Sequence, residues 1–389
     1  MRIVFVTQCH PCRELGGSRA QLELAEEWAA QGRTCVLLGP EELIRAAGGE
    51  VDLQTAFEAW LRGLGCEFDV VDYDHNYLLP ERAGLPPGVL YVARSVLFIP
   101  FVPLLLADDY AGLWRKIKLR LRRILAPKAP PQPGPPLYRI VPAMRRADAL
   151  NVPNTCDAAL AAALGIPSGK ILLHPFAISR ARRAELEAVR GKRLAPEFVF
   201  VGIFDSRKGG PVLPGIFARL KAEFPAARLT LLGAGGKADG KAIRRRFAPG
   251  LRDAVQVVPS FDNDELPSRL AKATVGLFPS RHEGFPFAVL EQLHAGVPVA
   301  AYDAPGVCDQ LPQDWLTLPG DPAALAACAA RLMRGVLAGE PLDAQARAHA
   351  ARFRIEDVAE DTWTRYAELV AAKAEHERSR TCSQLKGEV

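Results

Sequence analysis

The sequence predicts an α/β protein made of two Rossmann-like domains in tandem. Two stretches carry the same order of elements: a β-branched strand, a glycine-containing loop, an amphipathic helix and a second strand. The first stretch spans residues 2–38 and the second spans residues 197–236. A chain of 389 residues, of which 49% are hydrophobic, is long enough for two globular domains of ordinary size.

In the N-terminal half, "RIVFV" (2–6) is a short apolar run typical of a buried strand. Residues 20–31 follow with an apolar stripe at helical spacing, and Gly32 is suited to end that helix. "TCVLL" (34–38) is the next strand, which completes a βαβ unit with a right-handed crossover. Further strands are expected within residues 66–78, 88–95, 147–154 and 170–178.

The C-terminal half repeats this plan. The strand "EFVFVG" begins at Glu197, the loop "DSRKGG" follows it, and residues 211–224 form the helix. Further strands are expected within residues 228–236, 254–261, 274–280, 297–303 and 315–319. A helix over 355–373 is expected to end the ordered chain, with 374–389 as a mobile tail. A cleft between two such domains would face the carboxyl ends of both sheets, where open α/β sheets bind ligands.

Composition and charge exclude several classes of protein. Eight cysteines with only one C-x-x-C give neither a disulfide scaffold nor a paired zinc pattern. A net charge of +5 is mildly basic and far from a nucleic-acid-binding signature. Met1 leads directly into a strand instead of a signal-peptide core, so we expect a cytoplasmic protein.

The most informative stretch is "FPSRHEGFPFAVLEQLHAGVPVAAYD" (278–303). It predicts a strand, a turn at Glu283 and Gly284, a helix opened by Pro286, and another strand. The amino end of that helix points free N–H groups at the strand's carboxyl edge, where a phosphate can bind. Glu291, about a turn and a half into the helix, leans back toward the same edge. One carboxylate can therefore reach a sugar and the other a ribose.

The two carboxylates, as E-G-F-P-F-A-V-L-E, resemble the E-x7-E motif of retaining glycosyltransferases of family four, which have the GT-B fold. The resemblance covers nearly the whole chain, through "RKGG", "LLGAGG" and "LFPSRHEGF" to the closing helix. It implies two Rossmann-like domains that face each other across a cleft. Residues 1–185 would bind the acceptor, residues 186–354 would bind the nucleotide-sugar donor, and the closing helix would pack back toward the first domain.

The resemblance also implies roles for residues of the donor site. Glu283 would bind hydroxyls of the donor sugar and Glu291 the ribose, while Gly284 and Phe285 would offer backbone N–H groups. Lys208 matches the family's lysine of the "KG" pair, and Arg207 stands beside it. The family often has an arginine directly after the strand's glycine, where this chain has Ile203. Arg207 is a candidate to supply that missing charge.

The first loop offers two kinds of chemistry. Gly16 and Gly17 match the family's Gly-Gly pair, which lies against the donor diphosphate or the acceptor, because a residue without Cβ lets the backbone approach closely. Cys9 and Cys12 form a C-x-x-C, but a thioredoxin-like site needs that motif at the first turn of a helix. Here the helix is expected after Gly17, so we interpret the two thiols as incidental side chains of the loop that lines the cleft.

The residue that faces the reacting sugar is left open between Arg94 and His75. The family places a histidine at the end of a central N-domain strand, and Arg94 occupies the matching position, while His75 lies one loop earlier. Asp72 and Asp74 mimic a D-x-D metal site, but the fold that uses it would not explain the second βαβ half. "GGKADGKA" (235–242) lacks the Ser or Thr of a P-loop.

The implied activity is transfer of a sugar from a nucleotide-diphosphate sugar to a glycan or lipid-linked glycan acceptor, with retention at the anomeric carbon. No metal cofactor is expected, because Lys208, Arg207 and a helix amino end can stabilise the leaving diphosphate. A nucleotide-sugar epimerase or hydrolase of the same fold, or a non-catalytic nucleotide-sugar binding protein, is the alternative. Neither the base of the nucleotide nor the sugar follows from the sequence.

One segment predicts attachment to a membrane surface. Within 110–128, apolar residues recur at helical spacing, and seven Lys or Arg but no acid lie between Trp114 and Lys128. A basic amphipathic helix of this kind suits an anionic membrane surface. We therefore expect a peripheral protein on the inner face of the cytoplasmic membrane. The alternatives are an ordinary surface helix packed on the N-terminal domain, or a basic wall for a phosphorylated acceptor.

Overall fold

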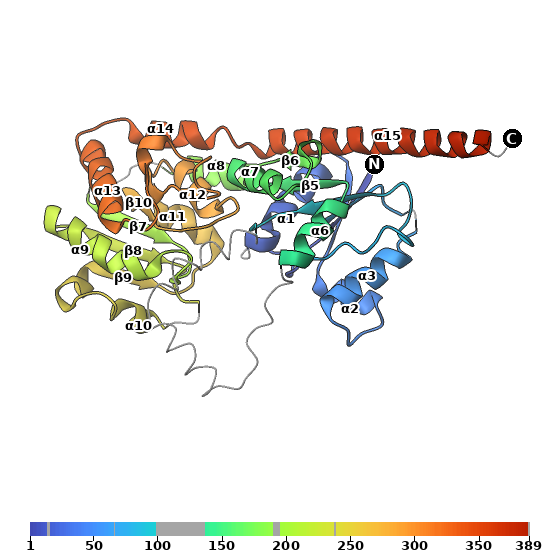
Figure 1. The fold of residues 1–389 in the computed structure, drawn as a ribbon. Coiled ribbons are helices and arrows are strands. Elements are labelled where there is room, and N and C mark those ends of the chain that lie inside the picture. Colours follow the sequence, from blue (N-terminus) through green and yellow to red (C-terminus); the bar gives the residue numbers. More distant parts are fainter. Residues whose placement is uncertain (14–15, 66, 99–136, 190–194, 237–238, 388–389) are drawn as a thin grey trace. The chain divides into compact units, whose positions relative to one another are not determined.

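The computed structural model describes residues 1–13, 16–65, 67–98, 137–189, 195–236 and 239–387. The chain divides into two compact units (Figure 1). Unit 1 comprises Met1–Val152, Asp157–His174 and Glu360–Val389, and unit 2 comprises Pro153–Cys156 and Pro175–Ala359. The chain enters the main part of unit 2 after His174, whereas the boundary was expected at residue 185.

Unit 1 contains a six-stranded sheet in which every pair of neighbouring strands is parallel. Short β-branched and apolar runs form its strands, as expected for strands covered on both faces. In sheet order the strands are β2 (Thr34–Leu38), β1 (Arg2–Val6), β3 (Val70–Asp74), β4 (Leu90–Arg94), β5 (Ala149–Val152) and β6 (Ile171–Leu173).

Helices cover the unit 1 sheet. Trp28 of α1 is fully buried, stacks on Phe5 of β1 at a centroid distance of 5.5 Å and meets Trp363 edge-on at 5.4 Å. Burial of large side chains of this kind stabilises a fold by about 1.5–3 kcal/mol each. The helices are α1 (Gly16–Ala30), α2 (Pro40–Ala46), α3 (Leu53–Gly63), α6 (Leu137–Arg146) and α7 (Thr155–Ala163).

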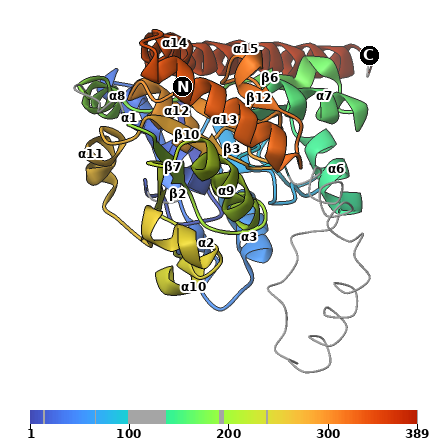
Figure 2. The same cartoon turned by 90° about the vertical axis from the view of Figure 1, so that its left-hand side faces the viewer.

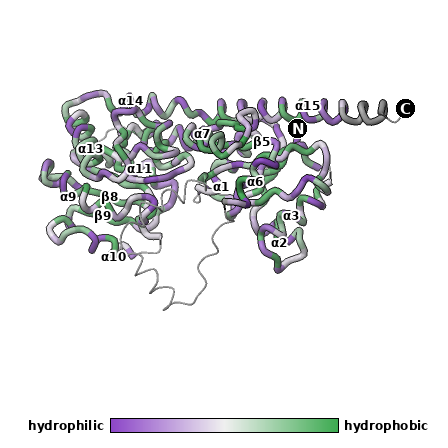
Figure 3. Tube along the Cα trace, viewed as in Figure 1, coloured by the Kyte–Doolittle hydropathy of each residue, from purple (hydrophilic) through white to green (hydrophobic). Residues whose placement is uncertain are grey.

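The C-terminal helix α15 (Ile355–Gly387) is longer than expected. Residues 374–387, expected as a mobile tail, continue the helix. Many of the α15 residues that Figure 3 colours are hydrophilic. From Glu360 onward the helix belongs to unit 1. Lys373 Nζ donates to the Val89 carbonyl (2.6 Å), and the Gly88 N–H donates to Glu377 (3.1 Å). These polar contacts hold a segment that has little apolar surface to bury.

Unit 2 contains a second six-stranded parallel sheet. Each strand expected from the sequence is present, at slightly narrower bounds. In sheet order the strands are β12 (Leu316–Thr317), β11 (Val299–Tyr302), β10 (Val275–Phe278), β7 (Glu197–Val201), β8 (Arg228–Leu232) and β9 (Val255–Val258). This is the strand order of doubly wound Rossmann folds.

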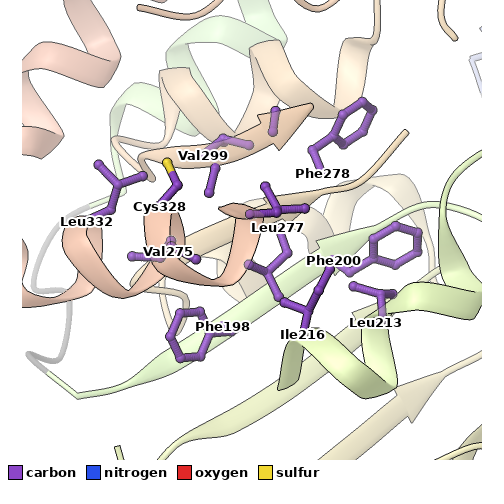
Figure 4. Packing of buried hydrophobic residues seen from close by; sticks show 14 of the residues in the cluster. Phe198, Phe200, Leu213, Ile216, Val275, Leu277, Phe278, Val299, Cys328 and Leu332 are labelled. Carbon is purple, nitrogen blue, oxygen red and sulfur yellow. The ribbon is translucent and has the colours of Figure 1, made fainter. Parts of the chain in front are cut away.

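The core of unit 2 lies between this sheet and its helices. Phe198, Leu277, Ile216 and Leu332 are fully or almost fully buried and pack together from strands and helices (Figure 4). Helices α9 and α13 lie against each other (Figure 2), and α12 packs against α8 and α14. The helices are α8 (Arg180–Glu187), α9 (Leu213–Glu223), α10 (Gly240–Arg244), α11 (Leu266–Leu270), α12 (Phe287–His294), α13 (Pro322–Leu337) and α14 (Leu342–Ala350).

The strand orders fix where each unit can bind a ligand. In unit 2 the order reverses between β7 and β10, and in unit 1 it reverses between β1 and β3. Loops that leave the carboxyl ends of two such strands diverge to opposite faces and open a crevice between them. The loops after β7 and β10 carry Lys208 and Glu283, so the sequence motifs lie at the switch point of unit 2.

The segment 110–128, in which we expect a membrane-binding helix, lies outside the described residues. In the part of the chain that is described, no helix is both long enough and apolar enough to cross a membrane.

Candidate active site

The loops after β7 and β10 are pressed together at the switch point of unit 2. The Arg281 N–H donates to the Arg207 carbonyl (3.0 Å), and the Ser280 hydroxyl oxygen lies 3.2 Å from the same carbonyl oxygen. Gly209 has a φ of 74°, and a Cβ there would lie 2.1 Å from the Pro279 carbonyl oxygen. Only glycine fits this position, which holds Lys208 and the turn at 281–284 close together.

Glu283 is the centre of an ion cluster formed by these two loops. Lys208 Nζ lies 2.8 Å from Glu283 Oε1, and Arg207 Nη1 lies 3.1 Å from the same oxygen. The hydroxyl of Ser280, in the loop after β10, donates to Oε1. The carboxylate is buried with its residue 6% exposed, whereas the Arg207 side chain is 39% exposed. The sequence motifs therefore converge on one atom.

The charge state of Glu283 follows from this cluster. Burial by itself raises the pKa of the carboxyl group, but the nearby charges of Lys208 and Arg207 outweigh burial, and the pKa is lowered from its ordinary value. Glu283 is consequently ionised at neutral pH. It is an acceptor of hydrogen bonds there and holds no proton to donate.

The Glu283–Gly284 turn rests on two further segments of unit 2. The Glu283 N–H donates to the Pro305 carbonyl (3.0 Å), and Asn154 Nδ2 donates to the Gly284 carbonyl (2.7 Å). Gly306 has a φ of 79°, and a Cβ there would lie 2.3 Å from the Glu283 carbonyl oxygen. Sequence reasoning missed Asn154, because its contact spans 130 positions and no local pattern marks it.

Aromatic packing anchors the amino end of α12. Phe285 is 3% exposed and meets Phe353 edge-on at 5.0 Å and Phe176 at 6.1 Å. Phe287 stacks on Phe176 at 5.8 Å. Pro286, expected as the first helical residue, is instead the N-cap, with φ −70° and ψ 113°. The backbone at 284–287 is therefore held by a rigid apolar cluster.

Glu291 is held by an arginine that sequence reasoning did not identify. Glu291 is 4% exposed, and Arg182 Nε of α8 lies 3.4 Å from its Oε1. Arg182 Nη2 also donates to the carbonyl and the side-chain oxygen of Asn263 (2.6 and 3.0 Å). In the sequence, Arg182 stands in "SRARRAE" and resembles a solvated helix arginine. Its contacts instead orient the second carboxylate of the motif.

In unit 1 the Gly-Gly pair lies inside a helix. α1 begins at Gly16, so the expected start after Gly17 was wrong, and both glycines stand in its first turn. A Cβ at Gly17 would lie 3.1 Å from Cys9 Sγ. The pKa of the Cys9 thiol is raised, chiefly by burial, which opposes formation of a reactive thiolate.

Arg94 lies in a buried polar network of unit 1. Its Nε donates to both oxygens of Asp72 (2.9 and 3.0 Å), and its Nη2 donates to Asp72 (2.6 Å) and to the Tyr366 hydroxyl (3.0 Å). Asn151 donates to the same hydroxyl (3.0 Å). Arg94 is 1% exposed. A sugar-facing role for Arg94 stays a prediction, and these contacts favour a structural role.

His75 follows β3 directly, at the switch point of unit 1. Its Nδ1 lies 3.6 Å from Asp74 Oδ1, and its ring lies 5.7 Å from that of Phe98. Burial lowers the pKa of His75, so the imidazole is neutral at pH 7. Asp74 accepts from the backbone and side chain of Asn76 (2.9 Å each). His75 is 1% exposed, like Arg94, so a sugar-facing role for His75 also stays a prediction.

A cavity of about 490 Å³ lies elsewhere in unit 2. Glu197 and Arg228, the first residues of β7 and β8, line it together with Lys272. It therefore opens at the amino ends of the strands, opposite the edge that carries Glu283. Ligands of open parallel sheets bind at the carboxyl edge, so this cavity is not the candidate active site.

Comparison with known proteins finds one family model that matches part of unit 2. The family model described as "Glycosyl transferases group 1" matches residues 195–335, a range that contains Lys208, Glu283 and Glu291. Over this range the chain is similar to group 1 glycosyltransferases. Among curated proteins, the chain is similar to a glycogen synthase of Mycobacterium tuberculosis, with 32% identity over 172 residues, which are 43% of this chain and 40% of the relative.

A 2-deoxystreptamine glucosyltransferase of Streptomyces kanamyceticus is 36% identical over 87 residues, which are 22% of each chain. The matches thus span less than half the length of these curated relatives.

Solved structures agree with the fold. HepE of Anabaena, solved in complex with UDP, superposes with a TM-score of 0.64 and 14% identity. The match covers 95% of this chain and 100% of the HepE chain. A sucrose-phosphate synthase of Thermosynechococcus elongatus covers 96% of this chain and all of its own, with a TM-score of 0.64 and 18% identity. The predicted fold class, with two parallel Rossmann-like sheets as in GT-B proteins, is confirmed.

Proposed function

We propose that this group 1 glycosyltransferase transfers a sugar from a nucleotide-diphosphate sugar to a glycan or lipid-linked glycan acceptor, with retention at the anomeric carbon. The observation that carries the proposal is the cluster of Lys208, Arg207 and Glu283 at the switch point of unit 2. It brings two cations and one ionised acceptor together where a phosphate-linked sugar would lie.

Each group of the cluster has a distinct task in this proposal. Lys208 and Arg207 bind the diphosphate and stabilise the charge that it gains as the sugar leaves. Glu283 accepts hydrogen bonds from sugar hydroxyls through Oε2, because Lys208, Arg207 and Ser280 all contact Oε1. Gly284 and Phe285 offer backbone N–H groups at the amino end of α12. These groups compensate the diphosphate charge without a metal ion.

Glu291 binds the ribose hydroxyls of the donor. Its carboxylate is buried, and Arg182 fixes its position from α8. The Arg182 Nε–Glu291 Oε1 distance of 3.4 Å is long for a charged hydrogen bond. Glu291 can therefore accept hydrogen bonds from the ribose hydroxyls beside Arg182. We propose UDP as the first nucleotide to test, because solved structures of HepE hold UDP and UDP-glucose.

In unit 1, we propose that the backbone at Gly16 and Gly17 contributes to binding of donor or acceptor. The first turn of a 15-residue helix presents free N–H groups, and glycine leaves them accessible. His75 lies at the same switch point and is the better candidate than Arg94 to face the reacting sugar, as a neutral hydrogen-bonding group.

The test is a panel of UDP-, GDP- and ADP-sugars, with nucleotide release measured with and without glycan acceptors. A transferase releases nucleotide with the acceptor, and NMR of the product should show the donor's anomeric configuration. Activity should be the same in EDTA. Release of nucleotide without an acceptor would indicate a hydrolase. A changed sugar that is still attached to its nucleotide would indicate an epimerase, and binding without turnover would indicate a non-catalytic protein.

We also propose that the segment 110–128 attaches the protein to an anionic membrane surface, as suits a lipid-linked acceptor. In a liposome co-sedimentation assay, binding should need anionic lipid, weaken with salt and fall when Arg120, Arg122 and Arg123 become Glu. The matched control makes the same charge change at the exposed residues Arg244, Arg245 and Arg246. Equal loss of binding in both variants would indicate a net-charge effect and refute a specific segment.

A further inference from the structure

Two cysteines that have no task in the proposed transfer lie in contact within unit 2. Cys156 Sγ and Cys308 Sγ are 3.4 Å apart, although 152 positions separate them in the chain. Cys156 stands in the first turn of α7, and Cys308 follows the β11 strand in the loop that contains Gly306. Both side chains are partly exposed, so small oxidants can reach them.

The surrounding contacts hold the two sulfurs face to face. The Thr155 N–H and hydroxyl donate to the two carboxylate oxygens of Asp309 (2.7 and 2.6 Å). Asn154 donates to the Gly284 carbonyl (2.7 Å). Thr155, directly before Cys156, is therefore hydrogen-bonded to Asp309, directly after Cys308. This pairing brings the two thiols into contact. A disulfide needs this kind of preset backbone, because its bond lengths and angles tolerate little distortion.

The two thiols are also unequal in acidity. The hydrogen bond between them lowers the pKa of Cys156, while the same bond and burial raise the pKa of Cys308. The position of Cys156 at the amino end of a helix favours its thiolate as well. Cys156 is thus the thiol that reacts first, and Cys308 is placed to resolve the product.

We propose that Cys156 and Cys308 form a reversible disulfide when the protein meets hydrogen peroxide. The Cys156 thiolate attacks the O–O bond, an S–O bond forms, and hydroxide leaves and is protonated to water. Cys308 then gives up its proton and attacks the Cys156 sulfur, so that the S–S bond forms, the S–O bond breaks and a second water leaves. The two thiols are oxidised by two electrons, and the peroxide is reduced.

The disulfide would restrain the candidate active site. It links the segment that contains Asn154 to the loop that contains Gly306. These two segments contact the backbone carbonyls of Gly284 and Glu283, respectively. Lys208 and Arg207 must reach the diphosphate while Glu283 accepts from sugar hydroxyls through Oε2, which requires that turn to adjust. On the proposed transferase function, the oxidised protein therefore turns over more slowly.

Peptide mapping tests the site without reference to activity. The full chain is reduced, treated with hydrogen peroxide, blocked with N-ethylmaleimide and digested with trypsin. A cross-link should join the peptides 147–170 and 282–331, and dithiothreitol should remove it. Peptide 282–331 also contains Cys328, so the Cys328→Ser variant should keep the cross-link while Cys308→Ser abolishes it. A cross-link at Cys9–Cys12 in its place would overturn the proposal.

Turnover tests the consequence. Fully oxidised protein should show a lower kcat that dithiothreitol restores, and Cys156→Ser should keep its kcat under peroxide. The Cys9→Ser/Cys12→Ser variant is the matched control and should lose kcat on oxidation like the wild type. An unchanged kcat in protein shown by mapping to be cross-linked would overturn the coupling to the active site. If no sugar donor is turned over in either state, the proposed transferase function fails, whereas the mapping result stands independently.

Discussion

Replacing Glu283 by Gln separates the proposed catalytic role of this residue from a structural one. Glutamine has the same shape, so the turn keeps its packing, but the charge that balances Lys208 and Arg207 is lost. In the free protein those cations can turn to solvent, since their side chains are 16% and 39% exposed. The loss in free energy of unfolding should accordingly be about 1 kcal/mol.

The effect on catalysis should be much larger. Glu283 is an ionised acceptor in contact with both cations, and a glutamine cannot match a carboxylate in holding sugar hydroxyls as charge develops. We expect kcat/KM to fall by about 10²-fold or more, equivalent to about 2.7 kcal/mol of transition-state stabilisation. UDP without its sugar should bind as well as before or more tightly, because Lys208 and Arg207 no longer share their charge with a carboxylate.

Nucleotide release and calorimetric titration with UDP measure these two quantities on the same preparations. Glu265→Gln is the matched control, because Glu265 also pairs with an arginine in unit 2 but is exposed and distant in sequence from the motif. Its kinetics should equal those of the wild type. Wild-type kcat/KM in Glu283→Gln, or weaker UDP binding than in the wild type, would refute the assigned role of this carboxylate.

Three further substitutions test other parts of the structure. Glu291→Ala should weaken UDP binding by roughly tenfold to a hundredfold in calorimetric titration, since a charged hydrogen bond contributes about 1.5–3 kcal/mol; unchanged affinity would remove the ribose contact. Arg94→Met should lower the free energy of unfolding in urea by about 3–5 kcal/mol, because it leaves Asp72 buried without its counter-charge, whereas loss of activity at wild-type stability would restore a catalytic role. The arginine pairing of Glu356 lowers its pKa to about 2, so its stabilisation is complete above about pH 5 and is lost as pH falls toward 2; Glu356→Gln should differ from the wild type only at the higher pH, and a stability difference independent of pH would contradict the ion pair.

The strands could be predicted because they are short apolar runs bounded by turn residues, and each expected strand is present in the described chain. Helix ends were less predictable. Glycine disfavours helix, so the start of α1 was placed after Gly17, yet the helix begins at Gly16. Likewise, polar composition suggested a tail after residue 373, but alanine, lysine and glutamate are good helix formers, and the contact of Glu377 with Gly88 holds the extension of α15.

The candidate site was predictable where its residues stand in one local pattern. Glu283 and Glu291 follow from strand, turn and helix, and Lys208 from the repeated βαβ unit. Arg182 and Asn154 were not predictable, since their partners lie 109 and 130 positions away. The burial of Arg94 could not be predicted either, because Tyr366, to which it donates, is 272 positions away.

A crystal structure of the full chain with bound UDP tests the central claim most directly. The account predicts the diphosphate within hydrogen-bonding distance of Lys208 and Arg207, and the ribose hydroxyls on Glu291 beside Arg182. A diphosphate bound elsewhere, for example among Glu197, Arg228 and Lys272 at the opposite edge of the sheet, would contradict it.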